Sequence, residues 1–164
     1  MIFSVKAPIL GFEQIKNVEL EKIDDFFYKL KSCDDETVFM LINPFLVRDY
    51  DFVVPDFFKN LLELDMESKP IVYNVMIVST PVETSVINFL APLVFNKEKK
   101  LVAQVLLDEG KYKEYGLTDN ISNYMKDLDL DKTIKQNLSR LVVGFSRNKV
   151  GWLGCKIYKC IIMH

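Results

Sequence analysis

Runs of neighbouring carboxylates are the residues of this chain that come nearest to a reaction site. Asp24-Asp25 and Asp34-Asp35-Glu36 could hold a hard cation, because such ions prefer carboxylate oxygens. A calcium loop, however, places its ligands at alternating positions, and neither run has that spacing. Aspartate also favours turns, where its side chain bonds its own backbone. We therefore expect solvated turns, and a metal-assisted hydrolase would require these carboxylates to converge in the fold.

The cysteines and the histidine give no catalytic or zinc-binding pattern. Cys33 precedes an acidic run, which raises rather than lowers a thiol pKa. Cys155 and Cys160 have only His164 nearby, whereas a structural zinc site needs four ligands. His164 is the single histidine, so a histidine base within a pocket is not expected. The sequence also has no glycine-rich phosphate loop. We predict no enzyme activity, no metal and no cofactor.

Composition and charge indicate a folded domain that works through contact. The 164 residues are 49% hydrophobic and 27% charged, as in ordinary globular proteins. No apolar stretch reaches the roughly 18 residues of a membrane-spanning helix, and the N-terminus has no secretory leader, so we expect a cytoplasmic protein. Residues 1–131 hold 14 basic and 23 acidic residues, a net charge of −9, whereas residues 132–164 hold 7 basic and no acidic residues. The acidic part predicts a protein-binding surface.

The hydrophobic pattern predicts a mostly β protein. Two apolar runs, residues 86–95 and 101–107, indicate two strands joined by a polar tip, with Pro92 at a bulge, bend or outward-facing edge. Further strands are expected at residues 2–5, 18–21, 26–30, 37–43, 50–54 and 71–78. Pro55 suits the start of a helix, and Thr118 suits the cap of a second one. These elements predict a compact antiparallel β-barrel or β-sandwich domain with one or two short helices.

The chain is expected to consist of a domain over residues 1–130 and a basic C-terminal extension over residues 131–164. Part of the extension has the spacing of an amphipathic helix, with an apolar face made of Ile134, Leu138, Leu141, Val142 and Phe145. A basic helix of this kind could pack on the acidic domain, or contact an anionic membrane or RNA. We favour docking or partial disorder, and expect no membrane and no direct nucleic-acid contact.

Four segments carry a family resemblance. The longest is NFLAPLVFN at residues 88–96, which AQV follows at residues 103–105. The others are APILGFE at residues 7–13, LINPF at 41–45 and DYDF at 49–52. In sequence and in order, these segments resemble the flagellar assembly factor FliW family. The resemblance covers about residues 1–126, and residues 127–164 have no counterpart in it.

The resemblance implies a β-barrel-like fold and a non-enzymatic adaptor. FliW proteins bind flagellin in the cytoplasm and, when free, bind the translational repressor CsrA, which relieves repression of flagellin mRNA. Flagellin and CsrA are therefore the implied partners, and we expect a monomer when the protein is free. CsrA holds RNA with basic residues, so an acidic protein docked beside the RNA site would repel phosphates. The flagellin contact is expected to use an apolar groove that receives an amphipathic helix.

Three groups of residues are assigned to these roles. For the charged contact we choose two segments, consisting of Asp34, Asp35, Glu36, Asp49, Tyr50 and Asp51. For the apolar contact we choose Phe45, Phe89 and Leu90, although core positions are the simpler interpretation of the last two. The family motifs also include Asn43, Pro44, Asn88, Pro92, Asn96 and Gln104. We interpret the polar members as side chains that satisfy the backbone and so determine the fold.

One alternative function follows from the predicted fold itself. A closed β-barrel of this size can enclose a pocket, so the protein could instead bind a small ligand. A barrel interior filled with side chains would argue against this alternative, and a lined cavity would favour it.

Overall fold

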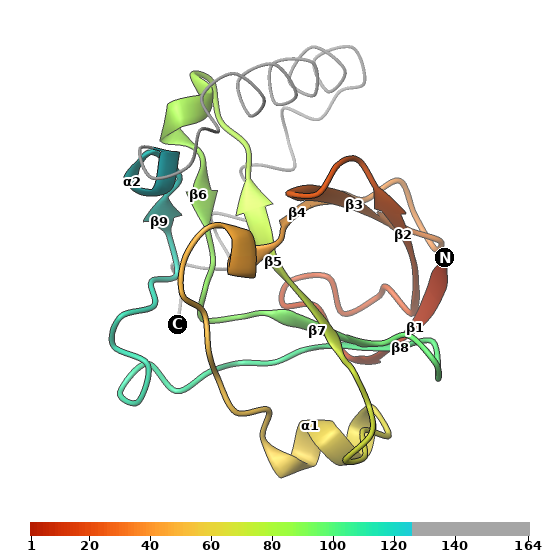
Figure 1. Cartoon of the computed structure of the whole chain (residues 1–164). Coiled ribbons are helices and arrows are strands. Elements are labelled where there is room, and N and C mark those ends of the chain that lie inside the picture. Colours follow the sequence, from red (N-terminus) through yellow and green to blue (C-terminus); the bar gives the residue numbers. More distant parts are fainter. Residues whose placement is uncertain (126–164) are drawn as a thin grey trace.

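The computed structural model describes residues 1–125 (Figure 1). The predicted extension over residues 131–164, its helix face and the end of the predicted domain lie outside the described residues. The elements are β1 (Ile2–Ala7), β2 (Asn17–Lys22), β3 (Phe27–Ser32), β4 (Val38–Ile42), η1 (Pro44–Leu46), α1 (Asp56–Leu61), β5 (Ile71–Ile77), η2 (Val82–Thr84), β6 (Val86–Ile87), β7 (Leu93–Asn96), β8 (Leu101–Gln104), β9 (Asp119–Asn120) and α2 (Ser122–Met125), where η denotes a 3-10 helix.

The strands form one sheet that closes on itself. Its order is β4-β3-β2-β1-β8-β7-β5, and β5 pairs with β4 again, so a barrel of seven strands results. Strands β6 and β9 continue the sheet from β5 and lie beside the barrel (Figure 1). This confirms the predicted mostly β, barrel-like fold with two short helices. One pairing differs from the antiparallel expectation: β1 and β8 are parallel, with Ser4 opposite Leu101.

Side chains fill the interior of the barrel. One buried cluster contains a residue from each of the seven barrel strands: Phe3, Val18, Leu30, Leu41, Tyr73, Phe95 and Val102. Because all seven strands face only the interior in common, this cluster lies inside the barrel. The rings of Phe3 and Phe95 meet edge to face at 5.0 Å between centroids, and those of Phe12 and Phe39 at 4.8 Å. The filled interior disfavours the ligand-binding alternative.

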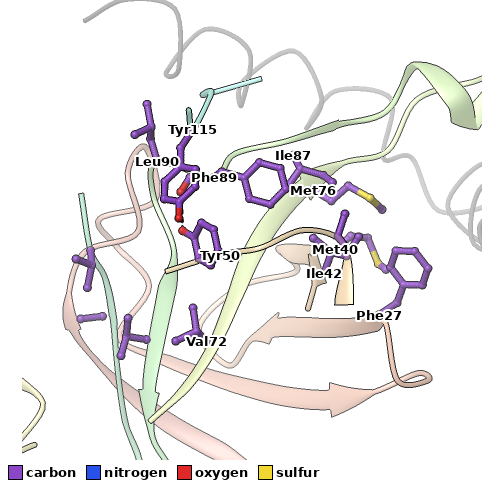
Figure 2. Packing of buried hydrophobic residues seen from close by; sticks show 14 of the residues in the cluster. Phe27, Met40, Ile42, Tyr50, Val72, Met76, Ile87, Phe89, Leu90 and Tyr115 are labelled. Atoms are coloured by element: carbon purple, nitrogen blue, oxygen red, sulfur yellow. Dashed lines mark hydrogen bonds between the residues drawn. The ribbon is translucent and has the colours of Figure 1, made fainter. Parts of the chain in front are cut away.

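A second buried cluster lies on the outer face of β4 and β5 (Figure 2). Because side chains alternate along a strand, Met40 and Ile42 of β4 point to this outer face, as do Val72 and Met76 of β5. Chain segments outside the barrel cover the cluster and contribute Tyr50, Leu62, Phe89, Leu90, Tyr115 and Ile121. We refer to this cluster as the outer core.

Three sequence predictions of secondary structure need correction. The run 86–95 is divided, since β6 ends at Ile87 and β7 begins at Leu93, with Pro92 in the irregular stretch between them. The segment 50–54 forms no strand. The second helix begins at Ser122 and not at Thr118, and Asn120 Oδ1 accepts the Ser122 N–H at 2.9 Å. The first helix and the β7–β8 hairpin are confirmed.

No helix within residues 1–125 is both long enough and apolar enough to cross a membrane.

Candidate functional site

Residues 43–55 run from β4 across the outer core to α1, and we refer to them as the crossing segment (Figure 1). Asn43 starts the segment, because its Oδ1 accepts the N–H of Phe45 at 3.2 Å. Pro44 is buried at the first position of η1. This turn leaves the side chain of Phe45 54% exposed. Of the three residues chosen for an apolar contact, Phe45 is therefore the one that a partner can reach.

Tyr50 anchors the crossing segment in the outer core (Figure 2). Its hydroxyl donates to the carbonyl oxygen of Phe89 at 2.6 Å, and Asn74 Nδ2 lies 3.4 Å from the Tyr50 oxygen. The Tyr50 ring lies 4.7 Å from that of Tyr115 and 5.6 Å from that of Phe89. Burial raises the pKa of Tyr50 well above its usual value. Tyr50 is thus a core residue, which corrects its assignment to the charged contact.

Two tyrosine hydroxyls bind the backbone of the crossing segment. The N–H of Asp51 donates to Tyr115 Oη at 2.8 Å, and the Tyr115 hydroxyl donates to the Asp51 carbonyl at 2.7 Å. The N–H of Val53 donates to Tyr112 Oη at 3.0 Å. Side-chain hydroxyls therefore replace a neighbouring strand, which explains why the alternating pattern of residues 50–54 forms no ladder. The side chains of Asp49 and Asp51 are exposed.

Arg48 holds the crossing segment in place, a role that the sequence did not indicate. Its guanidinium lies 4.8 Å from the ring centroid of Tyr115 and 5.2 Å from that of Phe89. The Nη1 atom donates to the carbonyl of Glu114 at 3.0 Å. It also lies 3.6 Å from Asp119 Oδ2. One arginine therefore ties the crossing segment to the chain between residues 114 and 119. A single arginine between Val47 and Asp49 gives no periodic signal that could have identified it.

The second acidic segment, residues 34–36, is the turn between β3 and β4. Asp34 Oδ2 accepts the backbone N–H groups of Lys16 and Asn17 at 2.6 and 2.9 Å, and these bonds lower the Asp34 pKa. Hydrogen bonds, above all with Thr37, also lower the pKa of Asp35. Asp34, Asp35 and Glu36 are all exposed. The turn precedes β4 and the crossing segment follows it, so the two acidic groups lie at opposite ends of this strand.

The side chains of Phe89 and Leu90 are 0% and 4% exposed. Asn88 Oδ1 accepts the N–H groups of Leu90 and Ala91, both at 3.1 Å, and so closes a turn that directs this stretch inward. Burial in the outer core contradicts the assignment of Phe89 and Leu90 to an apolar contact with a partner.

The amide side chains of the family motifs bond the backbone. Asn96 Nδ2 donates to the carbonyl of Leu62 at 2.9 Å, which ties the end of β7 to the residues after α1. Gln104 Oε1 accepts the N–H of Leu10 at 2.9 Å. Asn74, which the sequence analysis did not select, donates to the carbonyl of Asn88 at 2.7 Å. These bonds hold irregular segments against the barrel.

Metal-ligating side chains do not converge in the part of the chain that the structure describes: no group of three or more His, Cys, Asp or Glu residues is placed to hold an ion there. Asp34 and Asp35 accept backbone hydrogen bonds instead. The described site therefore offers three features for binding: exposed carboxylates, an exposed aromatic ring, and a backbone segment that tyrosines hold in place.

Comparisons with known proteins show which family this chain resembles. The family model described as FliW protein matches residues 1–118. The chain is 48% identical over 125 residues to Flagellar assembly factor FliW 2 of Wolinella succinogenes, covering 76% of this chain and 92% of that relative. It is 47% identical over 127 residues to Flagellar assembly factor FliW of Sulfurimonas denitrificans, covering 77% of this chain and 99% of that relative.

A solved structure gives the same result. The crystal structure of the flagellar assembly factor FliW resembles this fold with a TM-score of 0.66 and 26% identity, covering 73% of this chain and 84% of that one. From the family model, the curated relatives and the shared barrel, we conclude that this chain belongs to the FliW family of flagellar assembly factors.

Proposed function

We propose that this protein is a non-enzymatic cytoplasmic adaptor that binds flagellin and, when free of flagellin, binds and antagonises the repressor CsrA. The identity of 47% over almost the whole length of a relative named flagellar assembly factor carries this proposal. The adaptor would couple the supply of flagellin to the translation of its mRNA by exchanging one partner for the other. We expect the free protein to be a monomer.

The charge of the described domain supports a contact with a basic RNA-binding protein. Residues 1–125 hold 13 basic and 20 acidic residues, a net charge of −7. Asp49 and Asp51 project from the crossing segment, and Asp34, Asp35 and Glu36 from the opposite end of β4. A domain of this charge, docked beside an RNA site, raises the energy of bound phosphates without covering the site. We assign the charged contact to these five carboxylates.

The apolar contact is assigned to Phe45. Its ring packs edge to face against Tyr50, with 5.9 Å between centroids, so the core holds the base of an otherwise exposed side chain. Leu46, the next residue, is 38% exposed and extends the apolar surface. A rigid, half-exposed aromatic side chain is the usual anchor of a protein interface.

Binding of the full chain to purified flagellin and to CsrA from the same cell tests the proposal. Replacing Phe45 by Ser should weaken flagellin binding, while the matched change Ile2→Ser, on an equally exposed apolar residue of β1, should not. Reversing Asp49 and Asp51 to Lys should weaken CsrA binding and reduce its dependence on salt. Binding to neither protein would refute the adaptor function, and a salt-insensitive CsrA contact would refute the charge mechanism alone.

A further inference from the structure

Residues 51–54 of the crossing segment have two backbone edges: described residues bond one of them, and none of the described residues bonds the other. The N–H groups of Asp51 and Val53 point to the edge that Tyr115 and Tyr112 occupy. In an extended chain, the polar groups of the residues between them point the opposite way. Among the described residues, nothing bonds the N–H or carbonyl of Phe52 or the N–H of Val54. Within residues 1–125, this second edge is therefore a strand edge without a partner.

The segment already has the shape of a strand. Exposure alternates along it: Tyr50 is buried and Phe52 and Val54 are half-buried against the outer core, whereas Asp51 and Val53 are exposed. Such alternation belongs to extended backbone with one face buried. Figure 1 draws the stretch as coil, and no strand among the described elements pairs with it. The tyrosine hydroxyls hold it straight, so an incoming strand would not bear the entropic cost of ordering it.

We propose that residues 50–54 bind an extended segment of another protein by strand addition, at the edge formed by Phe52 and Val54. Backbone bonds at this edge would provide most of the affinity, as in other strand-addition complexes. The side chains on the exposed face would provide selectivity. We expect a Lys or Arg of the peptide opposite Asp51, and an apolar side chain opposite Val53, which is 62% exposed. The occupant is thus an extended peptide in which a basic and an apolar residue are two positions apart.

The surroundings support this choice of occupant. Asp49 lies on the same exposed face and adds a second negative charge beside Asp51. Two basic groups of this region lie at the bonded edge: Lys111 Nζ lies 5.3 Å from the ring centroid of Tyr112, and the Arg48 guanidinium lies over Tyr115. A basic residue of the peptide is therefore expected at Asp51 and not at Val53. The proposed strand addition does not require that the bound peptide belong to flagellin or CsrA.

Amide hydrogen exchange of the full chain with a synthetic probe peptide tests the proposal. The probe is a seven-residue, threonine-rich peptide that contains one Lys and one Val two positions apart. At saturating peptide, the amides of Phe52 and Val54 should gain protection, while those of Asp51 and Val53, which are already bonded, should change little. A probe N-methylated on the pairing edge should bind at least about tenfold more weakly, since it loses backbone bonds. Methylation on the other edge should have no such effect.

Reversing the charge of Asp51 tests the proposed selectivity against a control with the same change in net charge. The change Asp51→Lys should reverse selectivity, so that a probe with Glu in place of Lys binds better than the original. The control Glu36→Lys makes the same change in net charge on another exposed residue, and should leave the preference unaltered. Absence of protection at Phe52 and Val54, equal binding of both methylated probes, or a preference that Glu36→Lys alters as much as Asp51→Lys does, would overturn the proposal.

Discussion

Arg48 Nη1 lies 3.6 Å from Asp119 Oδ2, and this ion pair joins the crossing segment to β9. Tyr124 takes part in the same contact, since its hydroxyl lies 3.1 Å from the Asp119 carboxylate and 3.3 Å from Arg48 Nη1. Burial, followed by the Asp119 charge, raises the pKa of Tyr124. The exposed surface of the crossing segment thus rests on a cluster of charged and aromatic groups.

Removal of the Arg48 side chain should destabilise the domain. The guanidinium is mostly buried, donates to a backbone carbonyl and lies over three aromatic rings. We expect Arg48→Ala to lower the free energy of unfolding by about 2–3 kcal/mol, and Arg48→Lys to recover little of it, because an ammonium lacks the planar fork. Urea denaturation measures both. In the control Lys59→Ala, which breaks an exposed pair with Asp56, the loss should stay below about 0.5 kcal/mol.

A side chain at Gly116 should destabilise the domain while Asp119 is present. A Cβ at this position would lie 2.1 Å from Asp119 Oδ1, and Arg48 holds that carboxylate in place. Gly116→Ala should therefore cost about 1–2 kcal/mol of stability. In an Asp119→Ala background the clash is gone, so the same change should cost little. A double-mutant cycle in urea measures this coupling, and additive effects would show that the clash is relieved in another way.

The Tyr50 hydroxyl should contribute more to the folding free energy than the Tyr112 hydroxyl. Tyr50→Phe leaves the buried carbonyl of Phe89 without its donor, which we expect to cost about 1–3 kcal/mol of folding free energy. Tyr112→Phe frees the exposed N–H of Val53, which water can bond, so the loss should be below about 1 kcal/mol. Thermal or urea unfolding of the two variants gives the comparison, and equal losses would contradict it.

Stability should depend on the ionisation of Asp34. Backbone hydrogen bonds make its pKa lower in the folded than in the unfolded protein. The charged form therefore stabilises the fold above the unfolded value of about 3.9, and this contribution is lost as the pH falls through the lower folded value. Asp34→Asn should be less stable than the original at pH 7, with a difference that shrinks below about pH 4. Urea denaturation across this range measures it.

The control for Asp34 is its neighbour in the same turn. Glu36 is exposed, and no hydrogen bond of its side chain is found among the described residues. Glu36→Gln should therefore leave the free energy of unfolding almost unchanged at both pH values. A pH-dependent loss of similar size in Glu36→Gln would indicate a general charge effect in place of the Asp34 hydrogen bonds.

Local pattern predicted much of the fold and less of the site. The strands over Val18 and Leu20 and over residues 71–77 follow from alternation and apolar runs. The parallel pairing of β1 with β8 joins residues about a hundred positions apart, which no local pattern reveals. Residues 50–54 show the limit most clearly: the alternation correctly indicated extended backbone with a buried face, but a ladder needs a neighbour, and tyrosines from a distant segment occupy that place.

The roles of the candidate site residues could also be predicted only in part from the sequence. Phe89 is as apolar as Phe45, but Phe89 follows the turn made by Asn88 and is buried, whereas Phe45 is exposed. The exposed fractions of the two side chains therefore distinguish Phe45 from Phe89, which the sequence alone does not. Arg48 was overlooked because its partners lie between residues 89 and 124 and become neighbours only in the folded protein.

Release of RNA from CsrA tests the adaptor function most directly. CsrA is first bound to a labelled leader of flagellin mRNA, and the full chain is then added in increasing amounts, with and without flagellin, while the bound RNA is followed by fluorescence anisotropy. We predict that the chain alone releases the RNA, that added flagellin prevents the release, and that reversal of Asp49 and Asp51 to Lys weakens it. RNA that stays bound at saturating chain, or release that flagellin does not affect, would contradict the proposed exchange of partners.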